Sequence, residues 1–138
     1  MRALAAALAL LALAACASDA AEAGPEALGP GHVTVTLTIE HSRFTPEVVE
    51  VEAGTHVTFA VVNEDPIDHE LIVGPDEVHD RHENGTEAEH GTVPGEVTVR
   101  AGETAETSFH FAEAGDVAFA CHLPRHLAYG MRGEVRVG

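Results

Sequence analysis

Alternation of apolar and polar residues, rather than a helical repeat, runs through most of the chain beyond residue 31. In segment 32–39 every second residue is apolar, and the opposite face is mostly threonine. Segments 47–52 and 55–62 repeat the alternation on either side of a glycine-containing turn. A period of two is that of a β-strand with one buried face. The residues expected to face the core are Val33, Val35, Leu37, Ile39, Val49, Val51, Val57, Phe59 and Val61.

Short strand-like segments continue to the C-terminus, separated by turn residues, at 69–73, 96–100, 104–111, 116–121 and 133–137. About eight short strands at this spacing are typical of an all-β fold, a Greek-key antiparallel sandwich of two sheets. The exception is the polar stretch 75–94, in which Pro75 and Asp76 favour the start of one short helix and Asn84-Gly85 its end.

The charge of the chain excludes one class of partner. The 138 residues carry 7 Lys+Arg against 23 Asp+Glu, a formal net charge of -16. Nucleic-acid binding needs clustered cations, so we expect no nucleic-acid partner. At this length, with 45% apolar residues, the chain has enough material for one packed domain.

The N-terminal segment 1–15 has one arginine followed by an Ala/Leu run. The run is too short to span a bilayer and ends in small residues, which predicts a secretory signal peptide. The junction Leu13-Ala14-Ala15-Cys16 resembles a bacterial lipobox, in which Cys16 becomes the lipidated first residue. The alternative is an ordinary signal peptide with an incidental cysteine.

Both interpretations predict export. With a lipobox, the protein is anchored to the outer face of the cytoplasmic membrane through its N-terminal lipid alone; otherwise it is periplasmic or secreted. Residues 16–31 are rich in Ala, Gly, Pro and Glu, which predicts a disordered tether. The folded domain is then expected over residues 32–138.

Sulfur is scarce in that domain and confined to one segment. Cys121 and Met131 are its only Cys and Met, and with His126 they follow the spacing Cys-x4-His-x4-Met. If Cys16 is lipidated, Cys121 has no disulfide partner, and a lone exported cysteine requires another role. A thiolate, an imidazole and a weak thioether suit copper. A second imidazole is needed, and His69, at the start of an expected strand, is the candidate.

Residues 44 to 137 resemble a cupredoxin, the fold of the small blue-copper proteins such as plastocyanin and azurin. The resemblance rests on Phe44-x-Pro46, a strand pair around Ala53-Gly54, Asn63 through His69, and the set Cys121, His126 and Met131. It implies one type 1 copper per chain, with His69, Cys121 and His126 as equatorial ligands and Met131 as the axial one. It also implicates Asn63 in tying the two ligand loops together.

Two residues depart from that pattern. Many cupredoxins with this spacing have glycine before the second loop histidine, where this chain has Arg125. A nearby cation disfavours Cu(II), so Arg125 is expected to raise the reduction potential. The second is His122, next to Cys121, because multicopper enzymes of this superfamily use such a histidine for another copper. Neighbouring side chains of a strand point to opposite sides, so His122 is expected to pack or lie at the surface.

The remaining histidines divide into two groups. His79, His82 and His90 lie in the acidic excursion, and the first two are three residues apart, which places them on one face of a helix. They are a candidate second site for Cu(II) or Zn(II), with a solvated loop as the alternative. The others, His32, His41, His56 and His110, show no spacing that suggests ligation. Tyr129 is expected to pack over the ligand loop.

The leading hypothesis is a one-electron carrier outside the cytoplasmic membrane, and not an enzyme. The alternative is extracytoplasmic copper storage, delivery or resistance with the same fold. A redox partner protein is expected to dock transiently on the apolar residues around His126, namely Leu123, Pro124, Leu127 and Ala128. The acidic remainder of the surface favours a basic partner.

Overall fold

A computed structural model describes residues 26–85, 90 and 93–138. The expected signal peptide, Cys16 and most of the expected tether lie outside these residues. The described residues form nine strands and one helix: β1 (His32–Glu40), β2 (Arg43–Thr45), β3 (Val48–Val51), β4 (Thr55–Asn63), β5 (His69–Gly74), α1 (Asp76–Glu83), β6 (Glu96–Val99), β7 (Thr104–Phe111), β8 (Gly115–Ala120) and β9 (Arg132–Val137).

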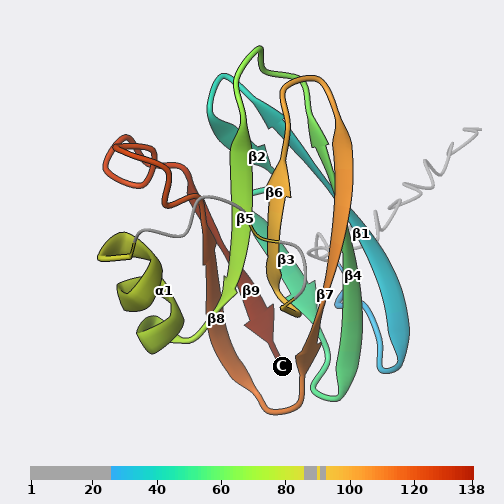
Figure 1. The fold of residues 1–138 in the computed structure, drawn as a ribbon. Helices are drawn as coiled ribbons and strands as arrows, with labels where there is room; N and C mark the ends of the chain where they lie inside the picture. Colours follow the sequence, from blue (N-terminus) through green and yellow to red (C-terminus); the bar gives the residue numbers. More distant parts are fainter. Residues whose placement is uncertain (1–25, 86–89, 91–92) are drawn as a thin grey trace, which may run out of the picture.

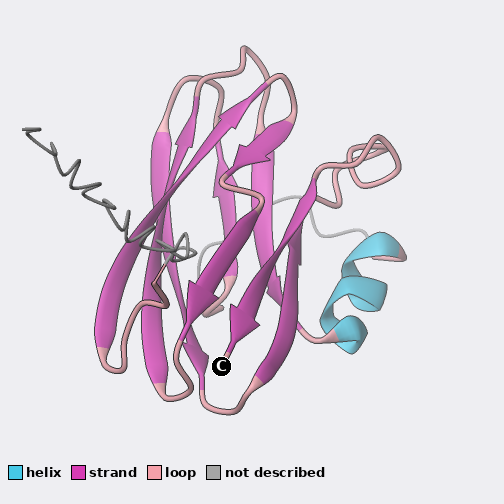
Figure 2. Cartoon of the chain, turned by 180° about the vertical axis from the view of Figure 1, so that it is seen from behind, coloured by secondary structure: helices cyan, strands magenta, loops and turns pink. Residues whose placement is uncertain are grey.

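The strands form two facing sheets, which confirms the all-β sandwich (Figure 1). One sheet has the order β2-β1-β4-β7 and the other β3-β9-β8-β5-β6. The helix α1 stands outside the second sheet, beside β5 and β8 (Figures 1 and 2). No helix of the described residues is long and apolar enough to cross a bilayer.

Most strand pairs are antiparallel, as expected, but the sheets are mixed. β1 pairs in parallel with β4, and β3 in parallel with β9. Alternation of inward and outward residues is the same in both kinds of pairing, so the sequence pattern does not separate them. The short β2, whose register places Phe44 opposite Ile39, was also not expected. Three residues are too few to show a period.

The core lies between the sheets and includes most of the alternating residues identified above. Leu37, Ile39, Val57, Phe59 and Val61 are completely buried. Of the nine residues expected to face inward, only Val33 is partly rather than mostly buried, and it packs against the core. The sandwich therefore buries one face of each long strand.

The folded part begins before His32. Leu28 forms a bridge with Val51 at the end of β3, and its N–H donates to Glu50 O at 3.0 Å. Glu52 N–H donates back to Leu28 O at 2.8 Å. Residues around Leu28 are thus attached to the second sheet, and the tether expected over 16–31 does not extend to its predicted end.

Candidate metal centre

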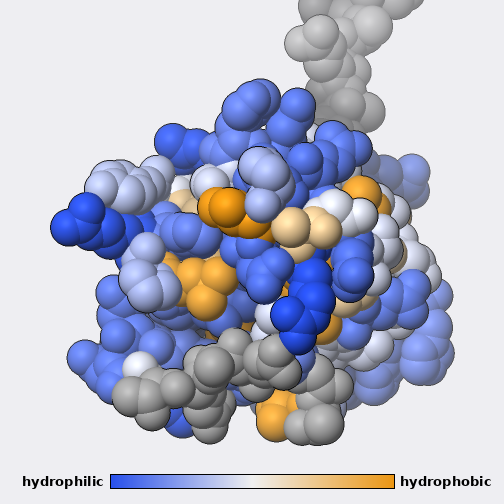
Figure 3. Space-filling view, turned by 45° about the horizontal axis from the view of Figure 1, so that its top comes forward, coloured by the Kyte–Doolittle hydropathy of each residue, from blue (hydrophilic) through white to orange (hydrophobic). Residues whose placement is uncertain are grey.

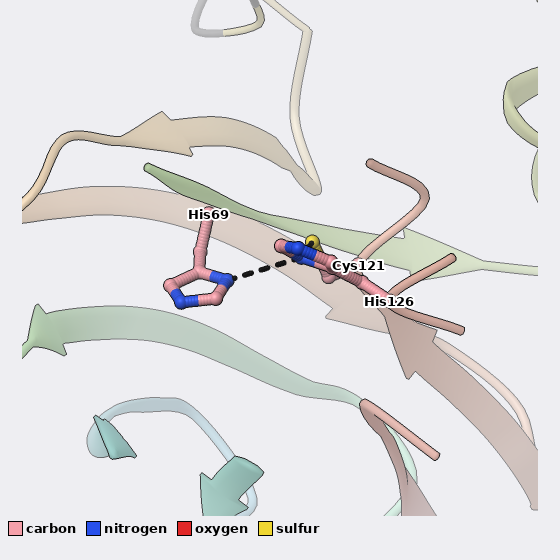
Figure 4. Close-up of side chains that lie close together, drawn as sticks. All are labelled: His69, Cys121 and His126. Carbon is pink, nitrogen blue, oxygen red and sulfur yellow. Dashed lines mark hydrogen bonds between the residues drawn. The ribbon is translucent and has the colours of Figure 1, made fainter. Parts of the chain in front are cut away.

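Three of the sequence-predicted ligands meet at one end of the sandwich (Figure 4). The ligand atoms of His69, Cys121 and His126 all lie within 4.8 Å of one another. His126 Nδ1 is 3.2 Å from Cys121 Sγ and 3.2 Å from His69 Nδ1. These residues come from the first position of β5 and from the loop between β8 and β9. The structure thus places His69, the histidine expected to complete the set, beside Cys121 and His126.

Met131 lies at the same end and is completely buried. Its carbonyl accepts a hydrogen bond from Cys121 N–H at 3.1 Å, and its own N–H donates to His126 O at 3.0 Å. These two backbone bonds close the loop on itself, so that Cys121, His126 and Met131 are held in one compact turn.

The environment of Cys121 disfavours a free thiolate and provides groups that can stabilise a metal-bound one. Burial raises the pKa of Cys121 to about 12, although backbone N–H groups of Glu70 and Leu123 donate to the sulfur and oppose the shift. A metal binds the thiolate, so binding releases this proton. The same two N–H groups remain in place to stabilise the bound sulfur.

His69 is oriented by a residue that the sequence analysis missed. Its Nε2 lies 2.9 Å from Asp65 Oδ2. The same carboxylate accepts the N–H groups of His41 and Ser42, both at 2.7 Å. Burial opposes the charge on Asp65, but these donors prevail and leave its pKa below the ordinary value. An ionised Asp65 accepts the proton on Nε2, which leaves the lone pair of His69 on Nδ1, facing His126.

Asn63 supports one ligand loop and not both, which corrects its expected role. Its Nδ2 donates to Ile67 O at 2.8 Å and to Arg100 O at 3.0 Å. Its Oδ1 accepts Asp65 N–H at 3.0 Å. Asn63 thus fixes the loop that carries Asp65 and His69 to the end of β6, and within the described residues its side-chain hydrogen bonds do not reach the Cys121 loop.

His126 is the ligand nearest to solvent, because it is partly exposed while His69 and Cys121 are buried. Burial and the neighbouring His69 both lower the pKa of His126, which favours the neutral ring that can bind a metal. Around it, Pro124 and Ala128 are exposed and Leu123 and Leu127 half-buried. Tyr129 does not pack over the loop as expected, since it is 67% exposed.

A second group of side chains that could bind a metal lies beside α1, and it differs from the expected set of His79, His82 and His90. The ligand atoms of His82 and His90 lie within 4.8 Å of each other and of Glu96, which sequence reasoning missed. His79 instead faces His122, with His79 Nδ1 2.9 Å from His122 Nε2. The side chain of His122 is only 2% exposed, so it packs against α1 as expected.

Acidic residues within predicted strand segments were the sequence signal that could have identified Glu96. Glu70 and Glu96 stand in β5 and β6 and are 3% and 4% exposed. Charged residues are almost never fully buried without a partner. A glutamate within an apolar strand segment therefore marks a partner elsewhere, although the sequence does not identify it.

The donor set fits copper: two imidazoles, a thiolate and a thioether on one loop and one strand are the ligands of soft-to-intermediate copper sites. The family model of copper binding proteins of the plastocyanin/azurin family matches residues 31–138. The copper-resistant cuproprotein CopI of Rubrivivax gelatinosus is 35% identical over 99 residues, which are 69% of this chain and 59% of that protein. This chain thus matches less than two thirds of that relative's length.

The protein of the same name from Vibrio cholerae is 32% identical over 120 residues, covering 83% of this chain and 69% of its own. Among solved structures, Auracyanin A, a "blue" copper protein from Chloroflexus aurantiacus, superposes with a TM-score of 0.62. It is 24% identical and covers 78% of this chain and 100% of its own, so it supports the fold. These matches confirm a cupredoxin-like copper-binding protein, and the chain belongs to the plastocyanin/azurin family of copper-binding proteins.

Proposed function

We propose that the chain holds a single type 1 copper and carries one electron at a time outside the cytoplasmic membrane. The observation that supports this most strongly is the meeting of His69 Nδ1, Cys121 Sγ and His126 Nδ1 at one end of the sandwich, with Met131 buried beside them. Copper bound by such a set supplies reversible Cu(II)/Cu(I) chemistry.

Rigid support of the ligands favours fast electron transfer, because little has to rearrange when the charge changes. His69 is fixed by Asp65, and the Cys121 loop is closed by its bonds to Met131. The N–H groups of Glu70 and Leu123 lie against the sulfur. Each support comes from a residue of this chain.

We also propose that a redox partner docks on the surface around His126. The exposed Pro124 and Ala128 and the half-buried Leu123 and Leu127 make a small apolar area. Figure 3 shows this end of the molecule with small apolar areas separated by hydrophilic ones. A small apolar contact suits a transient complex. The net charge of -16 favours a basic partner.

Copper resistance, through storage or delivery of the metal, is the second candidate. It is supported by the name of the relatives, copper-resistant cuproprotein, and by the cluster of His82, His90 and Glu96 beside α1. An electron carrier keeps its copper through many redox cycles, whereas a delivery protein surrenders it to an acceptor. The two functions therefore predict different rates of copper loss.

The test is a Cu(II) titration followed by visible absorption and electron paramagnetic resonance, with Cys121→Ser as the matched variant. We expect an intense thiolate-to-copper band at one copper per chain that is absent in Cys121→Ser. Correctly folded protein without this band contradicts a type 1 site. If the band is present, cyclic voltammetry and competition with a Cu(I) chelator separate the two functions. Reversible cycling with slow copper loss supports a carrier, and rapid loss supports delivery.

Export with a lipid anchor on Cys16 is proposed from the sequence alone, since residues 1–25 lie outside the described part of the chain. In a bacterial host, wild-type protein is expected in the detergent phase of a detergent-partition assay and Cys16→Ala in the aqueous phase. Wild-type protein in the aqueous phase, cleaved near residue 15, contradicts the anchor and leaves an ordinary signal peptide.

A further inference from the structure

A buried cluster of two histidines and a carboxylate lies between α1 and the second sheet, apart from the copper ligands. His82 comes from α1, Glu96 from the start of β6, and His90 from the segment between them. Their side chains are only 3% exposed for His82 and His90 and 5% for Glu96. His90 is fixed to β6, because its N–H donates to Thr98 Oγ1 at 2.8 Å and its carbonyl accepts Thr98 N–H at 3.1 Å.

One nitrogen of His82 has the properties of a metal ligand. Nδ1 lies 2.7 Å from Val78 O, and because a carbonyl only accepts, Nδ1 must carry the proton. In the neutral ring, the lone pair is then on Nε2. That atom is buried, has no hydrogen-bond partner among the described residues, and lies 3.2 Å from Glu96 Oε2. Two buried acceptors facing each other are unfavourable unless a cation lies between them.

His90 extends the same arrangement. Its Nδ1 is 3.3 Å from Glu96 Oε2, and its Nε2 is 3.4 Å from Glu70 Oε2. A neutral ring donates to one carboxylate only, so a proton on Nε2 serves Glu70 and leaves the lone pair of Nδ1 facing Glu96. Metal-bound histidines commonly donate their other ring nitrogen to a carboxylate in this way.

The spacing of these atoms suits a small divalent ion. Bonds of about 2.0–2.2 Å to nitrogen and oxygen in tetrahedral geometry separate neighbouring ligand atoms by about 3.3 Å. The distances from Glu96 Oε2 to the two histidine nitrogens are 3.2 and 3.3 Å. Arg81 Nη2 donates to the other carboxylate oxygen, Glu96 Oε1, at 2.7 Å, which keeps Oε2 directed toward the histidines.

We propose that His82 Nε2, His90 Nδ1 and Glu96 Oε2 form a second metal site, for Zn(II) or Cu(II). Imidazole and carboxylate suit these ions, and the absence of sulfur from the three ligands disfavours Cu(I). His82 and His90 also line a surface cavity of 710 Å³, which gives an entry path and room for water as a fourth ligand. The site is independent of the proposed type 1 centre, because it shares no ligand with it.

Protonation of both rings is the competing explanation, because two imidazolium groups also satisfy the carboxylates. A metal site and an ion-pair cluster differ in whether Zn(II) binds and in which residues its binding requires. The test is calorimetric titration of Zn(II) into the full chain carrying Cys121→Ser, which weakens the type 1 centre. Co(II) absorption, which reports tetrahedral ligation, is measured on the same protein.

We expect one Zn(II) per chain, with affinity reduced by more than about 10-fold when either His82→Ala or Glu96→Gln is added. The matched control is His110→Ala, an exposed histidine outside the cluster. With Cu(II), the second site is expected to give a resonance signal without a thiolate band. Circular dichroism establishes that each variant is folded. Arg81→Ala leaves all three ligands in place and removes only the donor to Glu96 Oε1, so we expect it to weaken Zn(II) affinity less than the ligand variants do.

Three results overturn the proposal. The first is that the Cys121→Ser protein does not bind Zn(II). The second is that His82→Ala and Glu96→Gln leave Zn(II) binding unchanged. The third is that His69→Ala removes Zn(II) binding instead. The last assigns the metal to the type 1 ligands, and the first leaves a protonated ion-pair cluster. Loss of the type 1 band in wild-type protein does not affect these measurements, so the two proposals fail separately.

Discussion

At the scale of single residues, Arg125 shows why glycine is common before the second loop histidine. Its φ is 74°, in the left-handed region that residues other than glycine rarely adopt. Its carbonyl accepts Tyr129 N–H at 3.0 Å within this turn. The turn therefore requires this backbone conformation, and an arginine occupies it at the expense of some strain.

Replacing Arg125 with glycine is expected to lower the reduction potential of the bound copper by about 10–40 mV. This corresponds to about 0.2–1 kcal/mol for an exposed charge acting on a one-electron couple. The relief of backbone strain is expected to raise stability by up to about 1 kcal/mol. Cyclic voltammetry and urea unfolding measure the two effects. Arg136→Gly, near the far end of β9, is the control, and a potential that stays constant or rises in Arg125→Gly contradicts the electrostatic argument.

Asp65 accepts hydrogen bonds from two backbone N–H groups and from His69. Asp65→Ala leaves these donors without their acceptor, so we expect a loss of about 2 kcal/mol or more in the free energy of unfolding. We also expect weaker copper binding, because His69 loses the partner that sets its tautomer. Chemical denaturation and copper titration measure these effects. Asp65→Asn, which retains an acceptor, should lose less; equal losses would falsify the hydrogen-bond explanation.

At the scale of strands, pairing assembles histidines that are far apart in the sequence. His32, His56 and His110 occupy registered positions on β1, β4 and β7. The rings of His56 and His110 stack with centroids 3.8 Å apart, and those of His32 and His56 are 4.8 Å apart. The sequence analysis found no relation among these residues, because only strand register brings them together.

This row predicts a measurable pH dependence. Desolvation lowers the pKa of His56, and the positive charges of His110 and His32 lower it further. His110→Ala removes one charge and one stacked ring, so the pKa of His56 is expected to move toward 6.5. Histidine titration followed by nuclear magnetic resonance measures it.

The sign of the stability effect follows from the same shift. A lowered pKa means that the unfolded chain binds the proton more strongly than the folded chain. The stability that the neutral His56 ring contributes is therefore fully present above the ordinary histidine pKa, and it is lost as the pH falls from there through the lower pKa of the folded state. His41→Ala, outside the row, should leave the pKa of His56 unchanged. The same change in both variants contradicts the assignment.

Close approach of two strands explains one glycine. A Cβ at Gly133, in β9, would overlap the Phe119 ring and Glu47 O. Phe119 is completely buried, so it has no room to move. Gly133→Ala is expected to destabilise the protein by about 1–3 kcal/mol, as overpacking does. Thermal unfolding tests this against Gly138→Ala, where nothing lies within 4 Å of the added atom; equal stability of the two variants contradicts it.

At the scale of the whole molecule, the net charge of -16 dominates long-range interactions. Electron exchange with a cationic metal complex is expected to slow as ionic strength rises, and exchange with an anionic complex to accelerate. Stopped-flow absorption at the thiolate-to-copper band measures both rates. Rates with both complexes that are independent of salt indicate that the net charge does not act at the site of electron entry.

The two ligand-bearing regions illustrate how far the sequence predicts this protein. Alternation identified the buried faces of the long strands, since each residue's side of a strand follows from its position alone. The sulfur-containing loop and His69 were also identifiable as a candidate site, because the combination of thiolate, imidazole and thioether at this spacing suits copper. The sequence thus predicts the features that depend on the residue types and their period within one segment.

The tertiary structure decided everything that depends on one segment meeting another. Parallel pairing of β1 with β4, the support of His69 by Asp65 and the meeting of His82 and His90 with Glu96 are set by register, loop path and packing. The members of each of these contacts lie in different segments or follow no regular spacing in the sequence. The sequence therefore determined the long strands and the candidate copper ligands, and the fold determined their partners, because contacts across space depend on the path of the whole chain.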